Sequence, residues 1–278
     1  MIESPIYLLS GIIFILALGV LAVKAKAIDI SGALVGGAIS FIAFLAGGAQ
    51  WLVIIVTFFL VSSLLTRYRY EYKRKMGSAQ GKSGVRSWPN TIANGGVAAT
   101  AATLELYFHA DILAIAYLGS IAAAMSDTLA TEVGLLSRTM PRLITHPERT
   151  VRPGTSGGVS PLGEGAALIS AFIIGMMGFL LTVIGKLNLD TFLVLVPSVL
   201  AGGILGTLID SLVGAKIEGI RECVVCKENT EERIHHDRPT VLTQGSKYVD
   251  NNVVNFIGIL AGAMISIVLF LLLRILVS

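Results

Sequence analysis

The sequence contains little charge. Only 14% of its 278 residues are Asp, Glu, Lys or Arg, while 54% are hydrophobic. Because about a quarter of the residues of an ordinary soluble domain are charged, this composition excludes that class of protein. Cysteine is also scarce, and Cys223 and Cys226 are too few for a disulfide scaffold. The first hydrophobic segment lacks the basic start and the cleavage site of a signal peptide, so we expect it to be a retained membrane span.

Long apolar runs are abundant instead. Runs of close to twenty residues recur along most of the chain, which is typical of a polytopic helical membrane protein. The 30 glycines fit this class, because small residues let helices pack closely in lipid. We predict an all-α fold, a transmembrane helical bundle of about eight spans that forms a single integral membrane domain over residues 1–278. The expected spans are Pro5–Val23, Ile30–Ala46, Gln50–Leu65, Ile92–Phe108, Ile112–Met125, Gly163–Ile184, Thr191–Ile209 and Val253–Leu276.

Lysine and arginine are distributed unevenly between the expected loops. The four loops on one side of the membrane (24–29, 67–89, 137–162 and 210–252) contain 19 of the 21 Lys and Arg residues. Positively charged loops stay in the cytoplasm, so we predict that this side is cytoplasmic and that both termini lie outside. Because the outer loops are very short, the site is expected on the cytoplasmic face, in the three largest of these loops.

Carboxylates at the ends of apolar spans are the first candidates for chemistry, because charged residues near membrane depth are costly and persist mainly where they have a function. Asp127 and Glu132 end the fifth span, and Asp210 and Asp250 lie at the predicted cytoplasmic ends of two others. Hard carboxylate oxygens are typical Mg²⁺ ligands, so we predict that these four residues bind magnesium. Helix capping or pairing with basic loop residues is the alternative. Asp127 and Glu132 lie about 140° apart on an ideal helix, and they can share one ion only if the helix breaks there.

The segment Thr150–Ser160 (T-V-R-P-G-T-S-G-G-V-S) is rich in glycine and hydroxyl groups. Glycines let backbone N–H groups converge on an anion, and Arg152 adds a positive charge. The segment is not a Walker A motif, because it lacks Gly-Lys-Ser/Thr. We interpret it as a phosphate-binding loop. The alternative is a tight connection into the sixth span, with Ser160 or Glu164 at an ordinary helix N-terminus.

The basic loop 67–89 precedes the fourth span. Much of its charge is expected to keep the loop in the cytoplasm and to attract anionic lipid. Lys82 and Arg86 differ, because they lead into a span that begins with Asn90 and Asn94, one helical turn apart. Amides at this position can bind phosphate or base edges, or they can simply cap the helix.

The start of the last span carries four residues with carboxylate or amide side chains, namely Asp250, Asn251, Asn252 and Asn255. Asp250 could cap this helix with nothing further implied. Four such groups within six residues exceed what capping needs, so we expect them to take part in a binding site.

Two cysteines and two histidines lie in the loop 210–252. Cys223 and Cys226 form a C-x-x-C motif, and His235 and His236 follow it. Together they could close a four-ligand, structural zinc site. A single C-x-x-C is a weak signal and adjacent histidines are awkward ligands for one ion, so free thiols in a solvated loop are the alternative.

Five motifs resemble one family of integral membrane proteins. They are N-G-G at Asn94–Gly96, S-D-T-L-A-T-E-V-G at Ser126–Gly134, P-G-T-S-G-G-V-S at Pro153–Ser160, D-S-L-V-G-A at Asp210–Ala215 and D-N-N-V-V-N at Asp250–Asn255. In order, and over nearly the whole chain, they resemble the family that contains plant phytyl-phosphate kinase and vertebrate transmembrane protein 19. The family's C-x-x-C region is matched as well, except that His236 replaces a cysteine.

The resemblance implies a kinase that converts an isoprenoid monophosphate of the phytyl, farnesyl or geranylgeranyl type into its diphosphate, with CTP favoured over ATP. The carboxylates add the expectation that the kinase depends on Mg²⁺. The expected catalytic residues are Asp127, Arg86 and Lys82, and the expected Mg²⁺ ligands are Asp127, Glu132, Asp210 and Asp250. The expected partners are a nucleoside triphosphate, a prenyl phosphate and membrane lipids, with no nucleic acid. The residues expected to bind nucleotide or acceptor are Asn90, Asn94, Ser126, Thr131, Arg152, Gly154, Thr155, Gly157, Gly158, Ser160, Lys216, Asn251, Asn252 and Asn255.

Other functions stay open at this point. A polyprenol kinase or a cytidylyltransferase that makes a CDP-lipid would use similar partners and differ in its products. A transporter or lipid scramblase would place ionisable groups near the membrane midplane with access from both faces, whereas the groups here cluster at one end. A non-catalytic scaffold would leave the clustered acids unexplained.

Overall fold

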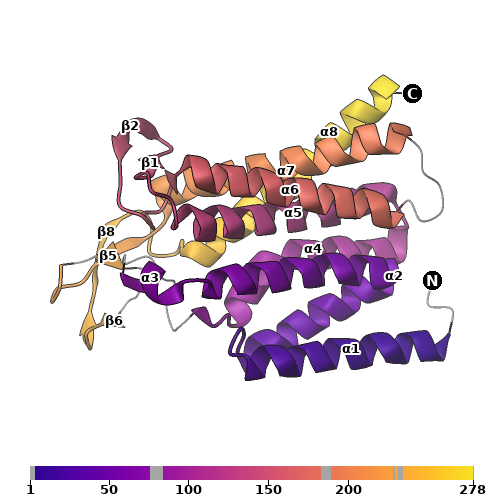
Figure 1. The fold of residues 1–278 in the computed structure, drawn as a ribbon, viewed down its shortest axis with the longest axis horizontal. Coiled ribbons are helices and arrows are strands. Elements are labelled where there is room, and N and C mark those ends of the chain that lie inside the picture. The colour runs from indigo at the N-terminus through magenta and orange to yellow at the C-terminus, as the bar shows by residue number, and fades with distance from the viewer. Residues whose placement is uncertain (1–3, 76–83, 183–188, 228, 231–233, 278) are drawn as a thin grey trace.

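The computed structural model of the protein describes residues 4–75, 84–182, 189–227, 229–230 and 234–277, and it is mostly helical. The long helices run along the longest axis of the molecule (Figure 1). The helices in the described residues are α1 (Pro5–Lys24), α2 (Ile30–Arg67), α3 (Tyr70–Lys75), α4 (Trp88–Phe108), α5 (Asp111–Gly134), α6 (Pro161–Thr182), α7 (Leu189–Ile217) and α8 (Asn251–Val277).

Six of the described helices are long and apolar enough to cross a membrane, namely α1, α2, α5, α6, α7 and α8, so the protein is a polytopic membrane protein. α2 breaks at Gly47 and Gly48, and Gly48 has a φ of +64°. The Ala49 N–H donates to the Tyr7 hydroxyl at 2.7 Å, near the start of α1, while both ends of α2 lie at the other end of the bundle (Figure 1). α2 is therefore a hairpin, and its two arms coincide with the second and third expected spans. α4 coincides with the fourth, but its many Ala, Gly and Thr residues make it less apolar and it is not among the six.

The prediction of an all-α fold is wrong for the loops, which contain short antiparallel β-strands. Strands of two to five residues leave no readable period in a sequence, so the pattern could not predict them. One sheet, between α5 and α6, has the order β2-β1-β3, and a second sheet and a hairpin lie between α7 and α8, in the orders β5-β4-β8 and β6-β7. The strands are β1 (Arg142–Leu143), β2 (His146–Thr150), β3 (Gly158–Val159), β4 (Ile220–Glu222), β5 (Asn229–Thr230), β6 (Ile234–His235), β7 (Arg238–Pro239) and β8 (Val241–Gln244).

Small residues bring α5, α7 and α8 into close contact. A Cβ added to Gly206 of α7 would lie 2.9 Å from both the Gly258 carbonyl oxygen of α8 and the Ala123 Cβ of α5. Nearer the loops, a Cβ added to Gly258 would lie 2.8 Å from the Cβ of Asp210. Glycine is therefore what lets these helices approach one another. The same packing fixes Asp210 against the neighbouring helices.

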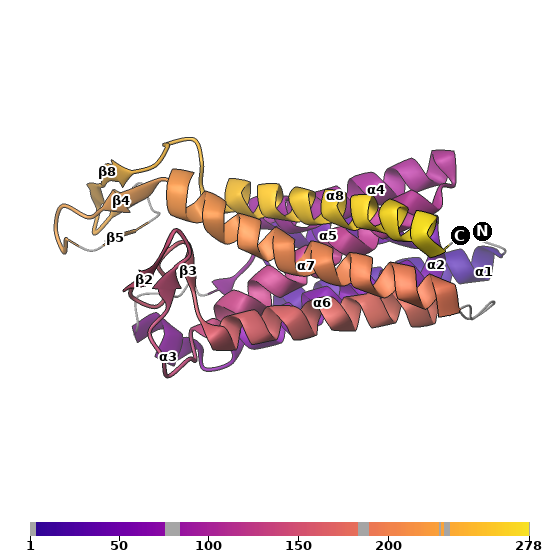
Figure 2. The same ribbon diagram turned by 90° about the horizontal axis from the view of Figure 1, so that it is seen from above.

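The loops that carry the candidate residues gather at one end of the bundle. α3 and the β-strands lie at this end, which we call the loop end, and both termini lie near the opposite end (Figures 1 and 2). The described parts of the loops 67–89, 137–162 and 210–252 lie at this end, and that these loops together form the site stays a prediction. That the loop end faces the cytoplasm stays a prediction from the distribution of Lys and Arg.

Candidate functional site

Two aspartates from different helices form the centre of the site. Asp127 of α5 and Asp210 of α7 lie within hydrogen-bonding reach of one another. Glu164 of α6 adds negative charge near Asp127, and Glu218, directly after α7, adds negative charge near both aspartates. None of the ion pairs between described residues includes either aspartate. Two carboxylates this close repel one another unless a proton or a cation lies between them, so the pair is suited to binding a cation.

Asn255 of α8 positions one member of the pair. It is buried, and with its amide oriented to satisfy both neighbours it donates to Asp210 Oδ2 at 3.3 Å and to the Asn251 carbonyl oxygen at 3.0 Å. Asn251 and Asn252 are half-buried in the first turn of the same helix. The structure therefore brings the start of α8 to Asp210. The Asn255 amide already has two hydrogen-bond partners within the protein.

Asp250 caps the N-terminus of α8, which was one of the two roles that the sequence allowed for it. Its side chain is exposed, and its Oδ1 accepts a hydrogen bond from the Val253 N–H at 3.1 Å in the first turn of α8. Its charge nevertheless acts on Glu218. Asp250 therefore contributes to the negative field at the edge of the site while it caps the helix.

Glu132 does not join the aspartate pair. α5 continues to Gly134, so the helix break that a shared ion would require is absent from this described helix. Instead, Lys73 of α3 pairs with Glu132 at 2.6 Å and also donates to the Leu65 carbonyl oxygen at 2.6 Å. Lys73 is only 2% exposed and Glu132 only 12%. Glu132 is thus the partner of a buried lysine in this structure, and its expected role as a Mg²⁺ ligand stays a prediction.

The glycine-rich segment folds against the end of α7. Gly154 and Gly157 have φ values of +80° and +72°, which favour glycine. A Cβ added to Gly157 would collide with Ala215 of α7, so the backbone approaches that helix closely. The Ser156 hydroxyl donates to the carboxylate of Glu218. The segment therefore lies beside the carboxylates.

The other predicted residues of this region have mostly local contacts. The Thr155 hydroxyl donates to the Arg152 carbonyl oxygen at 2.7 Å, and Gly158 belongs to β3. Ser160 is buried, and its hydroxyl accepts a hydrogen bond from a backbone N–H in the first turn of α6. The side chains of Arg152 and of Lys216, in the last turn of α7, are exposed. These two cations therefore lie on the surface of the loop end.

Ser126 and Thr131 lie on either side of Asp127 along α5, in different environments. Ser126 is fully buried, and its hydroxyl donates to the Ala167 carbonyl oxygen of α6 at 3.0 Å. Thr131 is exposed. Ser126 therefore joins α5 to α6, and its expected contact with a nucleotide stays a prediction.

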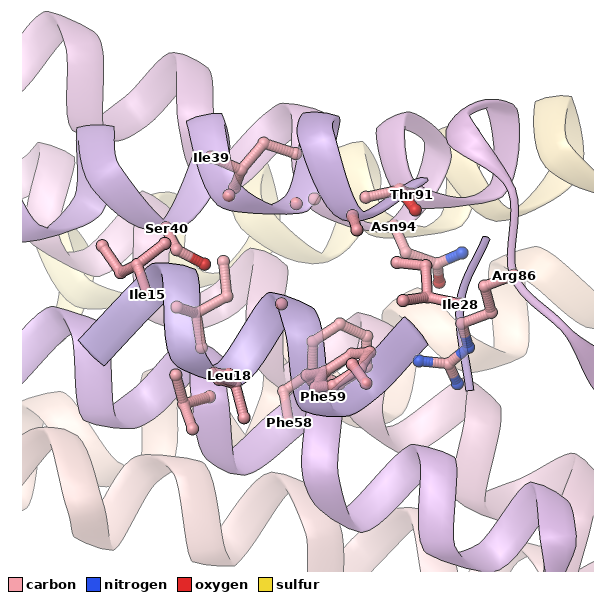
Figure 3. Close-up of a pocket in the computed structure, with 18 of the residues that line it drawn as sticks. Ile15, Leu18, Ile28, Ile39, Ser40, Phe58, Phe59, Arg86, Thr91 and Asn94 are labelled. Atoms are coloured by element: carbon pink, nitrogen blue, oxygen red, sulfur yellow. The ribbon is translucent and has the colours of Figure 1, made fainter. Parts of the chain in front are cut away.

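A second feature is an apolar pocket between α1, α2 and α4 (Figure 3). Figure 3 shows Arg86 and Asn94 at one end of the pocket and Ile15 towards the other. The Asn94 amide donates to the Asn90 carbonyl oxygen at 2.9 Å, and Asn90 also lines the pocket. Most of the wall is aliphatic or aromatic and includes Leu18, Ile28, Ile39, Ile55, Phe58 and Phe59.

Arg86 is fixed at the polar end of this pocket. Its carbonyl oxygen accepts from the Asp29 N–H at 2.9 Å, and its guanidinium carbon lies 6.0 Å from the centre of the Phe58 ring. Burial lowers the pKa of Arg86 to about 10 and nearby Glu132 opposes this, so the side chain is a cation at neutral pH. No hydrogen bond or ion pair found between the described residues uses its guanidinium group. Lys82, expected to act beside it, lies outside the described residues.

The four predicted zinc ligands come together. One donor atom from each of Cys223, Cys226, His235 and His236 lies within 4.8 Å of the others. His236 and Asp237 have φ values of +51° and +56°, as in a type I′ turn, and this turn between β6 and β7 brings the adjacent histidines to one centre. Hydrogen bonds from the Cys226 N–H and from His236 lower the pKa of the Cys223 thiol to about 5. The cluster could hold a metal ion such as zinc.

The sequence did not lead us to expect Glu218 and Lys73 beside the candidate residues. Glu218 follows Asp210 by eight residues, a spacing that places residues on the same side of a helix, and this signal could have found it. Lys73 is one of several basic residues in its loop, and no sequence signal separates it from the others.

Comparison with known proteins assigns the chain to a family. A family model described as "Integral membrane protein DUF92" matches residues 13–263. Protein PGR of Arabidopsis thaliana is 33% identical over 257 residues, covering 85% of this chain and 87% of that protein. The uncharacterized membrane protein MJ0933 of Methanocaldococcus jannaschii is 37% identical over 218 residues, covering 78% of this chain and 85% of that protein. Protein VTE6, chloroplastic, of Arabidopsis thaliana is 23% identical over 263 residues, covering 93% of this chain and 69% of that protein.

No solved structure matches the chain. The family model spans most of the sequence, and two of the relatives exceed 30% identity over most of their length. The chain therefore belongs to the DUF92 family of integral membrane proteins, which confirms the relationship that its five motifs predicted.

Proposed function

We propose that this protein is a kinase that transfers a phosphoryl group from CTP or ATP to an isoprenoid monophosphate and so forms the diphosphate. The observation that supports this most is the apolar pocket with the Arg86 cation at its polar end. Arg86 neighbours Glu132, which lies on the same helix as Asp127, so pocket and carboxylates belong to one end of the bundle. Family-level support comes from the relationship to VTE6 and from the resemblance of the five motifs to plant phytyl-phosphate kinase.

The pocket fits the two chemical parts of a prenyl phosphate. Its aliphatic and aromatic walls suit the hydrocarbon chain, and its few polar groups lie together at one end, as in most small-molecule sites. Arg86 supplies positive charge and a planar set of donors that matches phosphate oxygens. Asn90 and Asn94 add polar groups beside it. Lys82 is proposed as a further cation for the phosphate.

The aspartate pair fits Mg²⁺. Asp127 and Asp210 present hard oxygen ligands from two helices, and neither has a basic partner among the described ion pairs. Proteins usually bind Mg²⁺ through one or two carboxylates together with substrate phosphates, whose charge the ion neutralises. The glycine-rich segment beside the pair offers backbone N–H groups to the nucleotide phosphates. The exposed cations Arg152 and Lys216 are proposed to attract the nucleotide to this end.

The chemistry needs no general base. The second pKa of a phosphate monoester is about 6, so its attacking oxygen is already ionised near neutral pH. The main obstacle is repulsion between two polyanions. The residues named above lower the barrier by neutralising and aligning the two phosphate groups.

A product assay tests the proposal. Purified protein in lipid nanodiscs is incubated with Mg²⁺ and either CTP or ATP, across prenols and prenyl phosphates of several chain lengths. We expect a nucleoside diphosphate together with a prenyl diphosphate. CDP with a prenyl monophosphate would identify a polyprenol kinase, and pyrophosphate with a CDP-lipid would identify a cytidylyltransferase.

Transport or lipid scrambling is the alternative of another class. Transporters place their ionisable sites near the midplane, where both faces have access in turn. Here the carboxylates, the glycine-rich segment and Arg86 belong to the loop end, which favours an enzyme. Substrate flux in proteoliposomes that needs no nucleotide would reverse this choice.

The cysteine–histidine cluster is proposed to be a structural zinc site. The strands around Cys223, Cys226, His235 and His236 are two to four residues long, and β7 and β8 are exposed. Such short strands bury little apolar surface, and closed four-ligand zinc sites stabilise loops of this kind. Zinc would then hold the connection between α7 and α8 in its folded form.

A further inference from the structure

Glu218 has an unsatisfied carboxylate oxygen inside the loop end. The residue directly follows α7 and is only 2% exposed. Its Oε2 accepts a hydrogen bond from the Ser156 hydroxyl, whereas its Oε1 has no hydrogen-bond partner among the described residues. A buried carboxylate oxygen without a partner is costly, and native structures rarely keep one unless an ion, a water or a ligand satisfies it.

The backbone holds Glu218 in this position. The Gly219 N–H donates to the Val249 carbonyl oxygen at 2.8 Å, and the Ser246 N–H donates to the Ile217 carbonyl oxygen at 3.0 Å. Gly245, with a φ of +71°, packs so closely that an added Cβ would collide with the Glu218 carbonyl oxygen. The chain on both sides of Glu218 is therefore tied to the segment before α8, and the side chain cannot easily turn to solvent.

The surroundings of Glu218 are negative. Its charge acts on both Asp127 and Asp210, and Asp250 acts on it in turn. Burial raises the pKa of Glu218, the hydrogen bond from Ser156 opposes this shift, and the charge of Asp250 adds to it. No ion pair between described residues includes Glu218. A carboxylate held among other carboxylates, with one oxygen unused, has the chemistry of a cation ligand.

We propose that Glu218 is a ligand of a divalent cation, through its Oε1 atom, beside the pair of Asp127 and Asp210. This deepens the proposed function, and it rests on that function for the assignment of the two aspartates to Mg²⁺. Ser156, in the glycine-rich segment, holds the other oxygen of Glu218. The cation site and the proposed phosphate-binding segment are therefore joined through one side chain.

Binding of Mn²⁺, measured by electron paramagnetic resonance on the full-length protein in nanodiscs without nucleotide, tests this assignment. Glu218→Gln should weaken Mn²⁺ binding by at least about tenfold, since even loss of a residue that only supports a ligand costs about 10–100-fold. Glu222→Gln is the matched control, because Glu222 is partly exposed on β4, where it pairs with Lys227. The control should bind Mn²⁺ like the wild type.

Wild-type affinity in a folded Glu218→Gln protein would overturn the proposal. If that variant does not fold, Glu218→Asp replaces it: the charge is kept but the carboxylate is withdrawn, so weaker Mn²⁺ binding supports the proposal and unchanged binding overturns it. The outcome is separable from the kinase proposal. Mn²⁺ binding through Glu218 in a protein that forms no prenyl diphosphate would contradict only the proposed function. Diphosphate formation with unchanged Mn²⁺ binding in the variant would contradict only the role of Glu218.

Discussion

Replacing Lys73 by Met should strongly destabilise the protein. Lys73 and Glu132 are 2.6 Å apart and almost inaccessible to solvent. With an effective dielectric constant of about 20, Coulomb's law gives an attraction of about 6 kcal/mol at this distance, and desolvation of the two ions offsets part of it. Removing one partner of a buried pair typically costs about 3–5 kcal/mol, because the other charge is left uncompensated. We expect about 3 kcal/mol, since Arg86 stays close to Glu132 and partly neutralises it.

The free energy of unfolding in mixed micelles, titrated with a denaturing detergent, measures this effect. The double variant Lys73→Met with Glu132→Gln should recover much of the loss, because it leaves no uncompensated carboxylate. Lys227→Met is the control: Lys227 and Glu222 form an exposed pair at 3.6 Å, and such pairs contribute little. Wild-type stability of the single variant, or a double variant as unstable as the single one, would refute the reasoning.

Three further predictions concern the site and the cluster. Asp127→Asn should abolish metal-dependent phosphoryl transfer to geranylgeranyl phosphate. The control Asp111→Asn, at the exposed far end of the same helix, should keep this activity. Full activity of the Asp127→Asn variant would show that Asp127 is not part of the site. Arg86→Met should raise the KM for the prenyl phosphate by about tenfold or more, because the loss of one charged hydrogen bond has an effect of this size. The control Arg149→Met, on exposed β2, should leave this KM unchanged. Purified protein should contain one zinc ion per chain by elemental analysis, and Cys226→Ser should lose it; zinc retained by that variant would contradict the four-ligand site.

The helical part of the fold could largely be predicted from the sequence. The break at Gly47–Gly48 was predictable because two glycines interrupt an apolar stretch too long for one span, and the structure places a tight turn there. The strands of the loops could not be predicted in this way. β3 depends on pairing with β1, earlier in the chain, and β4 on pairing with β8, further along it, and no local pattern records such pairing.

The grouping of the candidate residues was predictable where the sequence carried a strong local signal. Asp127 and Asp210 each interrupt an apolar helix, and an isolated carboxylate in such a helix indicates function. Glu132 lies closer than Asp127 to the end of α5, but its partner Lys73 comes from α3, 59 residues earlier in the chain. The sequence can show that an acid needs a partner, whereas only the packing of the helices decides whether that partner is a lysine or another acid.

The pocket has a consequence for how the proposed activity should be measured. Its walls come from Ile15, Ile39 and Ile55, in the apolar arms of α1 and α2, so an acceptor bound there would keep its hydrocarbon tail inside the bilayer. The protein would then meet this substrate by lateral diffusion in two dimensions. Its rate should follow the mole fraction of prenyl phosphate among the membrane lipids, and adding inert phospholipid should slow the reaction even when the amount of substrate per millilitre stays constant.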